Sequence, residues 1–223
     1  MQTIHEYYEA LAPSYDASRF DTAYGRYLDR LERDLLGDWL GRTPHERVVD
    51  LACGTGRLLD FAATGVDQSA AMLAEAARKR PERAFLRADV TATGFAAGSF
   101  DAAIAFHLLM HLDEAAIRMV FAETARIVRS GGRFVFDVPS AYRRRVRPRH
   151  ERGWHAGTSA ALADIRSWCG DEWEVVRWRG LLAIPAHRLS AHWSRRLRPF
   201  DALIGRSPLA RWSSYLVVEL ERR

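Results

Sequence analysis

The chain has 223 residues, of which 48% are hydrophobic, a length and composition that predict one globular domain with a substantial core. The sequence has no apolar run near the roughly 20 residues that cross a bilayer, which excludes a spanning helix and favours a cytoplasmic protein, and its two distant cysteines, Cys53 and Cys169, exclude a disulfide framework or a cysteine-rich metal site. The net charge of +5 comes from the C-terminal third, because residues 1–140 carry 16 basic and 20 acidic side chains (net −4) and residues 141–223 carry 17 and 8 (net +9).

Residues 1–42 are predicted to form an N-terminal helical cap. Thr3–Leu11 and Asp21–Leu40 both show the helical spacing of apolar residues. In the second segment the apolar positions form one stripe, made of Tyr24, Leu28, Leu31, Leu35 and Leu36. Because such a stripe packs on a neighbouring layer, we expect these helices to cover part of the sheet that follows.

Residues 43–140 alternate short apolar or β-branched runs with helical patterns, which is typical of a parallel sheet with helices on both faces. The predicted strands are, in order, Arg47–Ala52, Gly65–Asp67, Ala84–Ala88, Phe100–Phe106 and Arg133–Val138. Two amphipathic helices are expected between them, Ser69–Arg80 and Asp113–Arg129, and each begins with a residue suited to cap its first turn. Ser130–Gly131–Gly132 is expected to end the second helix, because glycine tolerates the positive φ found past a helix end.

The C-terminal part, residues 141–223, is expected to be less regular. We predict in turn a basic loop, a helix, a strand, a long excursion and a last strand at Arg143–Arg149, Ser159–Cys169, Trp173–Trp178, 181–212 and Ser214–Leu220. The arginines of the loop favour a solvated surface, and the alternative is that they hold an anionic group of a bound acceptor. The excursion mixes apolar residues with arginines, so we interpret it as an irregular, basic, lid-like segment that covers the domain or a second copy. Weak contact with an anionic membrane surface is the alternative for this segment.

An apolar strand runs into a Gly-x-Gly turn in the sequence Val48-Val49-Asp50-Leu51-Ala52-Cys53-Gly54-Thr55-Gly56. Glycines let the backbone bend sharply there and let a ligand approach the main chain at the carboxyl end of a central strand. A dinucleotide-binding turn would carry a third glycine where Leu59 stands, and the sequence has no Gly-rich triphosphate loop. The turn therefore predicts a ligand site but leaves the ligand open.

Three acidic residues, Asp50, Asp67 and Asp89, end three consecutive predicted strands. The Asp67 carboxylate is placed to accept hydrogen bonds from the two hydroxyls of a ribose, and that of Asp89 is placed to accept one from an adenine amino group. Negative charges gathered in one pocket attract a cationic ligand and repel the pyrophosphate of a nicotinamide cofactor. The pattern thus favours a cationic ligand that contains adenosine.

Five ordered stretches resemble the motifs of class I S-adenosylmethionine-dependent methyltransferases of the small-molecule type. They are Asp-Leu-Ala-Cys-Gly-Thr-Gly from Asp50, Gly-Val-Asp-Gln-Ser-Ala-Ala-Met-Leu from Gly65, Ala-Asp-Val from Ala88, Ser-Phe-Asp-Ala-Ala-Ile-Ala-Phe-His-Leu-Leu-Met-His-Leu from Ser99 and Arg-Ile-Val-Arg-Ser-Gly-Gly-Arg-Phe-Val-Phe-Asp-Val-Pro from Arg126. The resemblance implies an α/β, Rossmann-like fold with a seven-stranded, mostly parallel sheet, an antiparallel last strand and helices on both faces. It also implies S-adenosyl-L-methionine as cofactor and S-adenosyl-L-homocysteine as product.

The resemblance further implies roles for single residues. It places Asp50, Ala52, Gly54 and Gly56 around the methionine portion, Asp67 and Gln68 at the ribose, Asp89 and Val90 at the adenine, and the Phe106 carbonyl at the amino group. Tyr15, with Asp16 and Arg19, resembles the family's N-terminal substrate lid, in which Arg19 would face the cofactor carboxylate. Only ten residues separate Gly56 from Asp67, so the helix after the glycine turn is expected to span two turns at most.

Catalysis is expected to depend on alignment of the acceptor, because the reactive methyl group comes with the cofactor and a base is optional. His107 follows the fourth strand and is predicted as that base, with a hydrogen bond to the loop or cofactor as an equally weighted alternative. Tyr15 is predicted to flank the acceptor, whereas Tyr7 and Tyr8 on the first predicted helix are interpreted as packing residues. His111 is interpreted as structural, because it begins the next helix and can satisfy the first turn.

These observations predict a methyltransferase that acts on an oxygen or nitrogen atom of a small molecule, including an anionic one, as a monomer or homodimer. No metal is predicted. An RNA methyltransferase is the alternative prompted by the basic C-terminal third, but Phe106-His107-Leu108-Leu109 stands where the Asn/Asp-Pro-Pro-Tyr tetrapeptide of base-amino methylation would be. A module that binds the cofactor without catalysis is a second alternative.

Overall fold

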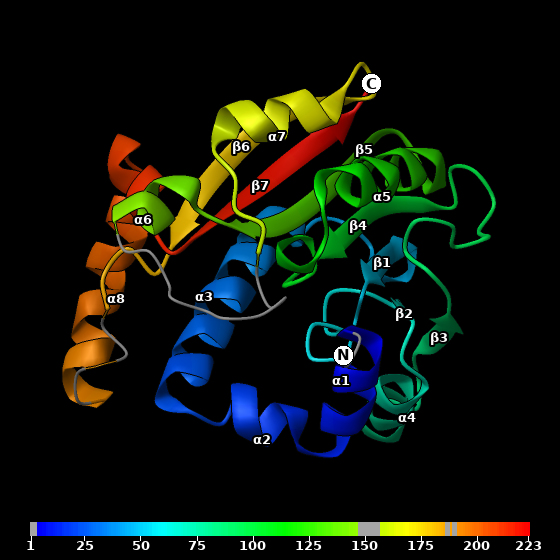
Figure 1. Cartoon of the computed structure of the whole chain (residues 1–223), viewed down its shortest axis with the longest axis horizontal. Coiled ribbons are helices and arrows are strands. Elements are labelled where there is room, and N and C mark those ends of the chain that lie inside the picture. Colours follow the sequence, from blue (N-terminus) through cyan, green and yellow to red (C-terminus); the bar gives the residue numbers. More distant parts are fainter. Residues whose placement is uncertain (1–3, 147–156, 186–187, 189–190) are drawn as a thin grey trace.

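The computed structural model describes residues 4–146, 157–185, 188 and 191–223. Seven strands form one sheet in the order β3-β2-β1-β4-β5-β7-β6, shown in Figure 1. Their bounds are β1 Val48–Leu51, β2 Thr64–Asp67, β3 Ala84–Arg87, β4 Phe100–Ala105, β5 Val128–Pro139, β6 Trp173–Leu181 and β7 Tyr215–Arg222. Strands β1 to β5 pair in parallel, whereas β7 is antiparallel to both β5 and β6. The predicted Rossmann-like sheet with an antiparallel last strand is confirmed.

Helices cover both faces of this sheet (Figure 1). The α-helices are α1 Ile4–Leu11, α2 Tyr15–Arg19, α3 Ala23–Leu40, α4 Ala70–Lys79, α5 Glu114–Ile127, α6 Ala141–Val146, α7 Leu162–Cys169 and α8 Ala191–Gly205. Short 3-10 turns lie at η1 Ala12–Ser14, η2 His45–Arg47, η3 Leu109–His111 and η5 Pro208–Trp212. In the described part of the chain, none of the helices combines the length and apolar character that a membrane crossing needs.

The hydrophobic core lies in two layers, because successive residues of each strand point to opposite faces of the sheet. On one face, α5 and α7 pack on β4, β5 and β7 through side chains that include Phe121, Trp168, Phe134, Phe136 and Val218. On the other face, the leucine stripe of α3 packs on β1, β4 and β5 through Leu36, Trp39, Val48, Ile104 and Val135. The strands that carry the glycine turn and its neighbours are therefore held rigidly from both sides.

Polar caps fix where the central helices begin. Ser69 Oγ accepts a hydrogen bond from Met72 N at 3.0 Å, and Asp113 Oδ1 accepts one from Ala116 N at 2.8 Å. Both predicted caps are thus in place, and each satisfies a backbone N–H that the helix cannot. The cap of α3 is Thr22, whose Oγ1 accepts a hydrogen bond from Gly25 N at 2.9 Å.

Two expectations about the central segment need correction or refinement. Residues 54–60 form consecutive turns, so the short helix allowed for after the glycine turn is not formed at all. Ser130–Gly131–Gly132 does not end a helix: α5 already ends at Ile127, and the three residues lie inside β5. Val128 pairs with Phe100 ahead of a register shift, and this early pairing places the glycines within the strand.

The C-terminal part is more regular than predicted. Arg143–Arg145 belong to helix α6 and not to a loop, whereas 147–149 fall outside the described residues. The excursion 181–212 was wrongly interpreted as irregular, because α8 and η5 make up most of it. Pro199 and three arginines interrupt the spacing of apolar residues in α8, and prediction of a helix from sequence depends on that spacing.

Candidate functional site

The glycine turn after β1 places bare main chain at the carboxyl end of the sheet. Ala52, Gly54 and Gly56 take positive φ angles of 62°, 55° and 77°. A Cβ atom added at Gly54 would meet nothing within 4 Å, so this residue opens toward free space. One added at Gly56 would lie 3.1 Å from Ala76 Cβ, so Gly56 instead lets the turn pack closely on α4.

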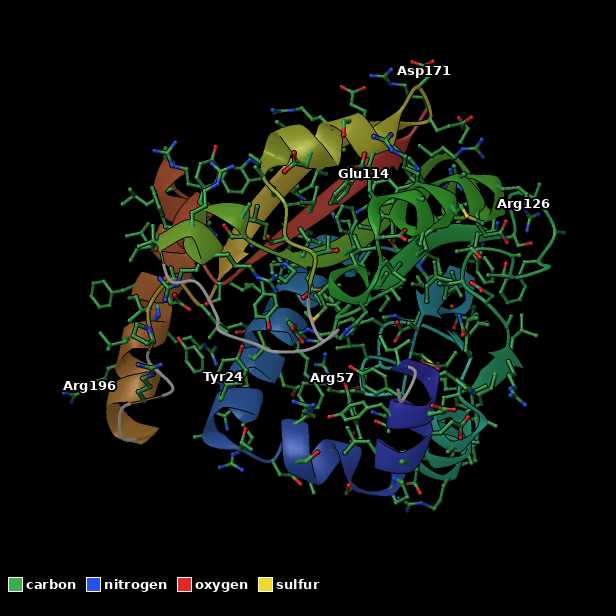
Figure 2. The ribbon with its side chains drawn as sticks, in the orientation of Figure 1. Tyr24, Arg57, Glu114, Arg126, Asp171 and Arg196 are labelled. Atoms are coloured by element: carbon green, nitrogen blue, oxygen red, sulfur yellow. The ribbon has the colours of Figure 1, made fainter. Side chains whose placement is uncertain are left out.

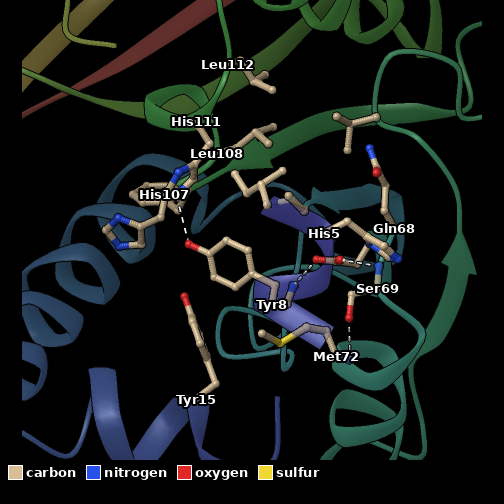
Figure 3. Close-up of a pocket in the computed structure, with 16 residues that line it drawn as sticks. His5, Tyr8, Tyr15, Gln68, Ser69, Met72, His107, Leu108, His111 and Leu112 are labelled. Atoms are coloured by element: carbon tan, nitrogen blue, oxygen red, sulfur yellow. Dashed lines mark hydrogen bonds between the residues drawn. The ribbon is translucent and has the colours of Figure 1, made fainter. Parts of the chain in front are cut away.

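A cavity of about 170 Å³ lies beside this turn (Figure 3). Eight predicted site residues line it, namely Tyr15, Ala52, Gly54, Asp67, Gln68, Val90, Phe106 and His107. A smaller cavity shares several of these residues and adds Asp50. Three other predicted residues, Arg19, Gly56 and Asp89, are not among the described residues that line either cavity. The sequence motifs therefore converge on one space, supplied by the turn, the ends of β2 and β4, and the N-terminal helices.

The three predicted carboxylates have different surroundings. Asp67 braces the turn, because its Oδ2 accepts a hydrogen bond from Gly54 N at 2.8 Å and its Oδ1 accepts one from Ser69 N at 2.9 Å. Asp50 is buried, and burial raises the pKa of its carboxyl to about 8. Asp89 is exposed and accepts hydrogen bonds from Thr91 N and Oγ1 at 2.8 and 2.7 Å. The site is thus less uniformly anionic than three free carboxylates would make it.

His107 stands at the end of β4 with its ring between two buried carboxylates. Its Nε2 lies 2.9 Å from Glu32 Oε1 and its Nδ1 lies 3.3 Å from Asp137 Oδ2. Asp137 Oδ1 also accepts a hydrogen bond from His107 N at 2.6 Å, at a residue whose φ is +59°. Burial alone would lower the pKa of His107, but the two carboxylates outweigh it and raise that pKa above its ordinary value. This arrangement favours a protonated ring over a free base.

The amino-acid pattern has known counterparts. Residues 49–136 match the family model described as a methyltransferase domain. The predicted resemblance to class I S-adenosylmethionine-dependent methyltransferases is confirmed over this segment, the methyltransferase core. This match agrees with the predicted cofactor, S-adenosyl-L-methionine.

The matches to curated relatives cover only part of this chain and only part of each relative. A demethylmenaquinone methyltransferase of Beutenbergia cavernae is 40% identical over 134 residues, which are 57% of this chain and 54% of that protein. One of Renibacterium salmoninarum is 34% identical over 134 residues, which are 57% of this chain and 55% of that protein. The chain thus spans about half the length of these relatives.

Solved structures resemble the fold over more of the chain. A Thermotoga maritima protein, described as a possible histamine N-methyltransferase, covers 99% of this chain and 100% of its own, with a TM-score of 0.72 at 17% identity. The geranyl diphosphate C-methyltransferase of Streptomyces coelicolor covers 87% of this chain and 78% of its own, with a TM-score of 0.61 at 18% identity. At these identities the likeness shows the fold alone.

A buried ion network, which the sequence did not predict, joins the turns after β1 to α3. Arg57 Nη2 lies 2.7 Å from Glu32 Oε2, and its Nη1 donates to Asp29 Oδ1 at 2.7 Å. The guanidinium also lies over the Phe20 ring, 4.1 Å from its centroid, and Figure 2 shows Arg57 between α3 and the central turns. One available signal was Glu32, an acidic residue within the leucine stripe of α3, because a buried carboxylate needs a cationic partner.

The first two helices close over the cavity as a cap. Glu9 accepts hydrogen bonds from Ala70 N and Ala71 N at 2.7 and 3.1 Å, at the first turn of α4. Asp16 accepts one from Thr55 Oγ1 at 2.6 Å and forms an ion pair with Lys79. The cap is thus fastened both to α4 and to the glycine turn.

Two predictions about the cap and the following turn are modified by the structure. Arg19 is exposed and donates to Tyr7 Oη at 2.7 Å, so it does not face the cavity in this structure. His111 does not satisfy the first turn of α5, which Asp113 caps. Instead it lines the cavity, where its Nε2 lies 3.0 Å from Tyr8 Oη (Figure 3). Tyr8 and His111 therefore join the candidate site, and no spacing in the sequence linked them.

Proposed function

We propose that the chain transfers the methyl group of S-adenosyl-L-methionine to an oxygen or nitrogen atom of a small molecule. The observation that carries this proposal is the convergence of eight motif residues on one cavity at the carboxyl ends of β1, β2 and β4. The adenosine is proposed to lie toward Asp67, Gln68 and Val90. The methionine portion is proposed to lie against Gly54 and Asp50.

The acceptor is proposed to be mostly apolar with one polar atom. Leu108 and Leu112 line the cavity beside His111 (Figure 3), and this surface suits an apolar body. The polar groups on that side include Tyr8 and His111, which lie within hydrogen-bond distance of each other. Burial raises the pKa of Tyr8, so the phenol keeps its proton. In the His111 tautomer whose Nε2 carries no proton, Tyr8 Oη donates to that nitrogen.

Transfer requires the acceptor atom to lie in line with the sulfur–methyl bond, and fixed side chains around the cavity supply that alignment. Where the acceptor must lose a proton, the proposed path runs through Tyr8. The acceptor's proton passes to the Tyr8 oxygen as the Tyr8 proton passes to His111 Nε2. His107, held between Glu32 and Asp137, is proposed to position the end of β4 and not to accept that proton.

Isothermal titration calorimetry with S-adenosyl-L-homocysteine tests the cofactor part of the proposal. The wild-type chain is expected to bind, and Asp67→Asn is expected to weaken binding by about 10-fold or more, because it replaces a charged hydrogen-bond acceptor. Asp171→Asn, at an exposed position far from the cavity, is the matched control and should bind like wild type. Absence of binding to the wild-type chain would overturn the proposal.

Transfer itself is measured with labelled S-adenosyl-L-methionine and a panel of apolar phenols and amines. Tyr8→Phe is expected to lower kcat by about 100-fold or more, the size of general acid–base contributions, while the affinity for the demethylated cofactor stays unchanged. Bound cofactor with no transfer to any acceptor would instead support the non-catalytic module. A methyl group recovered on carbon would refute the proposed acceptor atom.

A further inference from the structure

Exposed apolar side chains gather at one end of the molecule. Seven large hydrophobic residues are exposed in the described part of the chain, and five of them belong to α6, α8 and η5: Val146, Phe200, Leu203, Leu209 and Trp212. These three elements lie together at the left of Figure 1, and the Tyr142 and Trp212 rings, 5.7 Å apart, join α6 to η5. Single exposed apolar residues are ordinary, but a group of five on adjoining elements marks an interaction site.

Polar contacts fix which face of α8 points outward. Asp201 is buried, its Oδ1 accepts a hydrogen bond from Ile184 N at 2.8 Å, and its Oδ2 accepts one from Tyr27 Oη at 3.3 Å. Arg198 pairs with Asp34 of α3 at 3.1 Å. With this face held inward, the helical period places Phe200 and Leu203 outward, where they are 59% and 66% exposed. The apolar outer face is therefore a consequence of how α8 is anchored.

The same elements carry strong positive charge. Residues 141–146 and 191–212 contain eight arginines and one acidic residue, the buried Asp201. Arg196 lies on the outer side of α8, far from the central Arg57 (Figure 2). Arg211 lies near the Trp212 ring, 5.8 Å from its centroid. Apolar side chains interleaved with arginines, and a tryptophan among them, are typical of a surface that enters the headgroup region of a bilayer.

We propose that α6, α8 and η5 form a docking surface for an anionic phospholipid bilayer. A second copy of the chain fits this surface poorly, because pairing it with itself would bring two arginine-rich faces together. A nucleic acid would satisfy the arginines but leave Phe200 and Leu203 without an apolar partner. An anionic bilayer complements both the charge and the apolar side chains.

The docking surface lies at the same end of the sheet as the cavity, where the parallel strands have their carboxyl ends. Helix α6 begins where β5 ends, and η5 comes just before the start of β7 at Tyr215. The Tyr215 ring packs edge-on to the His107 ring, 5.7 Å between centroids, which ties this end of the sheet to the site. If the proposed function holds, a docked chain would present its cavity to acceptors dissolved in the bilayer; the docking itself requires no cofactor.

Vesicle co-sedimentation of the full chain tests the proposal. The wild-type chain is expected to bind vesicles of phosphatidylglycerol and phosphatidylcholine about 10-fold or more tightly than vesicles of phosphatidylcholine alone, and to lose this preference at high salt. The variant Phe200→Ser/Leu203→Ser should lose about 10-fold or more in binding. Its matched control is Met119→Ser/Val176→Ser, at two residues 55% and 52% exposed outside the docking surface, which should bind like wild type.

Charge is tested in the same way. Arg206→Glu/Arg211→Glu should weaken binding to anionic vesicles, whereas Arg166→Glu, exposed on α7, should not. A variant that binds S-adenosyl-L-homocysteine like wild type is folded. This second measurement also distinguishes a failure of docking from a failure of the proposed cofactor binding. Equal binding to both vesicle types, wild-type binding by the Phe200/Leu203 variant, salt-dependent RNA binding without vesicle binding, or dissociation of a dimer by that variant would each overturn the proposal.

Discussion

The two buried carboxylates on the ring of His107 decide what that residue can do. Burial favours an uncharged imidazole, but Glu32 and Asp137 stabilise the imidazolium more strongly, so the pKa of His107 is raised. Arg57 and His107 in turn outweigh the effect of burial on Glu32 and lower the pKa of that carboxyl. A ring that keeps its proton and touches two anions is a positioning group. Of the two roles that the sequence left open for His107, this geometry favours the hydrogen-bonding one.

Asp50 gives the cofactor site a predicted pH dependence. Its pKa of about 8 means that the carboxyl is largely protonated at neutral pH without cofactor. A cationic cofactor nearby favours the carboxylate and lowers that pKa, so binding should release a proton near pH 7. The affinity for S-adenosyl-L-methionine is therefore expected to rise between about pH 6 and about pH 8 and to level off above the folded pKa.

Calorimetry at neutral pH in phosphate and in Tris measures this proton, because the two buffers differ in ionisation enthalpy. Asp50→Asn should abolish the dependence of the binding enthalpy on buffer, and Asp171→Asn should preserve it. In the free protein the same raised pKa contributes stability at low pH that is lost as the pH rises toward about 8. Affinity that stays constant across this range in the wild-type chain would contradict the prediction.

At the scale of elements, the sequence predicts best those segments whose burial follows a local period. The strands around Val49 and Phe134 carry apolar residues on both faces because both faces are covered, and Ser69 and Asp113 cap their own helices. Helix α8 escapes prediction because Pro199 and its arginines interrupt the apolar positions, and because Asp201 anchors its inner face while apolar residues stand on its outer face.

The glycine turn and its carboxylates could likewise be predicted, whereas much of the site's wall could not. Tyr8 and His111 are 103 residues apart in the sequence but lie within hydrogen-bond distance of each other. Arg57 forms an ion pair with Glu32, which belongs to a different element. Contacts of this kind depend on how the helices pack on the sheet, which no short motif encodes. The motifs predict the glycine turn and the carboxylates at the strand ends, whereas the side chains that complete the site come together only through tertiary packing.

The N-terminal cap is predicted to control how long the cofactor stays bound. Asp16 fastens α2 to Thr55 of the glycine turn and to Lys79 of α4. Asp16→Asn removes the charge of a half-exposed pair, which is worth about 0.5–1 kcal/mol, so the cofactor should dissociate about 2–5 times faster. Stopped-flow displacement of a fluorescent cofactor analogue measures this rate, and hydrogen exchange should show less protection of α1 and α2. Asp21→Asn, exposed just beyond α2, should leave both readouts unchanged.

At the scale of the whole molecule, one sheet links the N-terminal and C-terminal parts of the chain. Strand β5 joins the cofactor side to β7 through seven paired positions, and Arg133 contacts Glu219 at 3.2 Å and the Trp39 carbonyl at 2.6 Å. The two core layers each draw residues from the central strands and from β7. Such shared packing favours a single cooperative unit, as the sequence analysis proposed for residues 1–223.

Cooperativity on this scale predicts how the cofactor product changes thermal unfolding. S-adenosyl-L-homocysteine at about 100 times its Kd should stabilise the fold by about 2.7 kcal/mol. For a chain of this size that corresponds to a rise in Tm of roughly 5–10 °C. Because the cavity and the C-terminal strands share one sheet, scanning calorimetry should show a single transition that shifts as a whole. The Phe200→Ser/Leu203→Ser chain, altered only on its outer face, is the control, and its Tm should shift by the same amount as that of wild type. A second transition whose Tm the ligand does not change would show that residues 141–223 unfold independently.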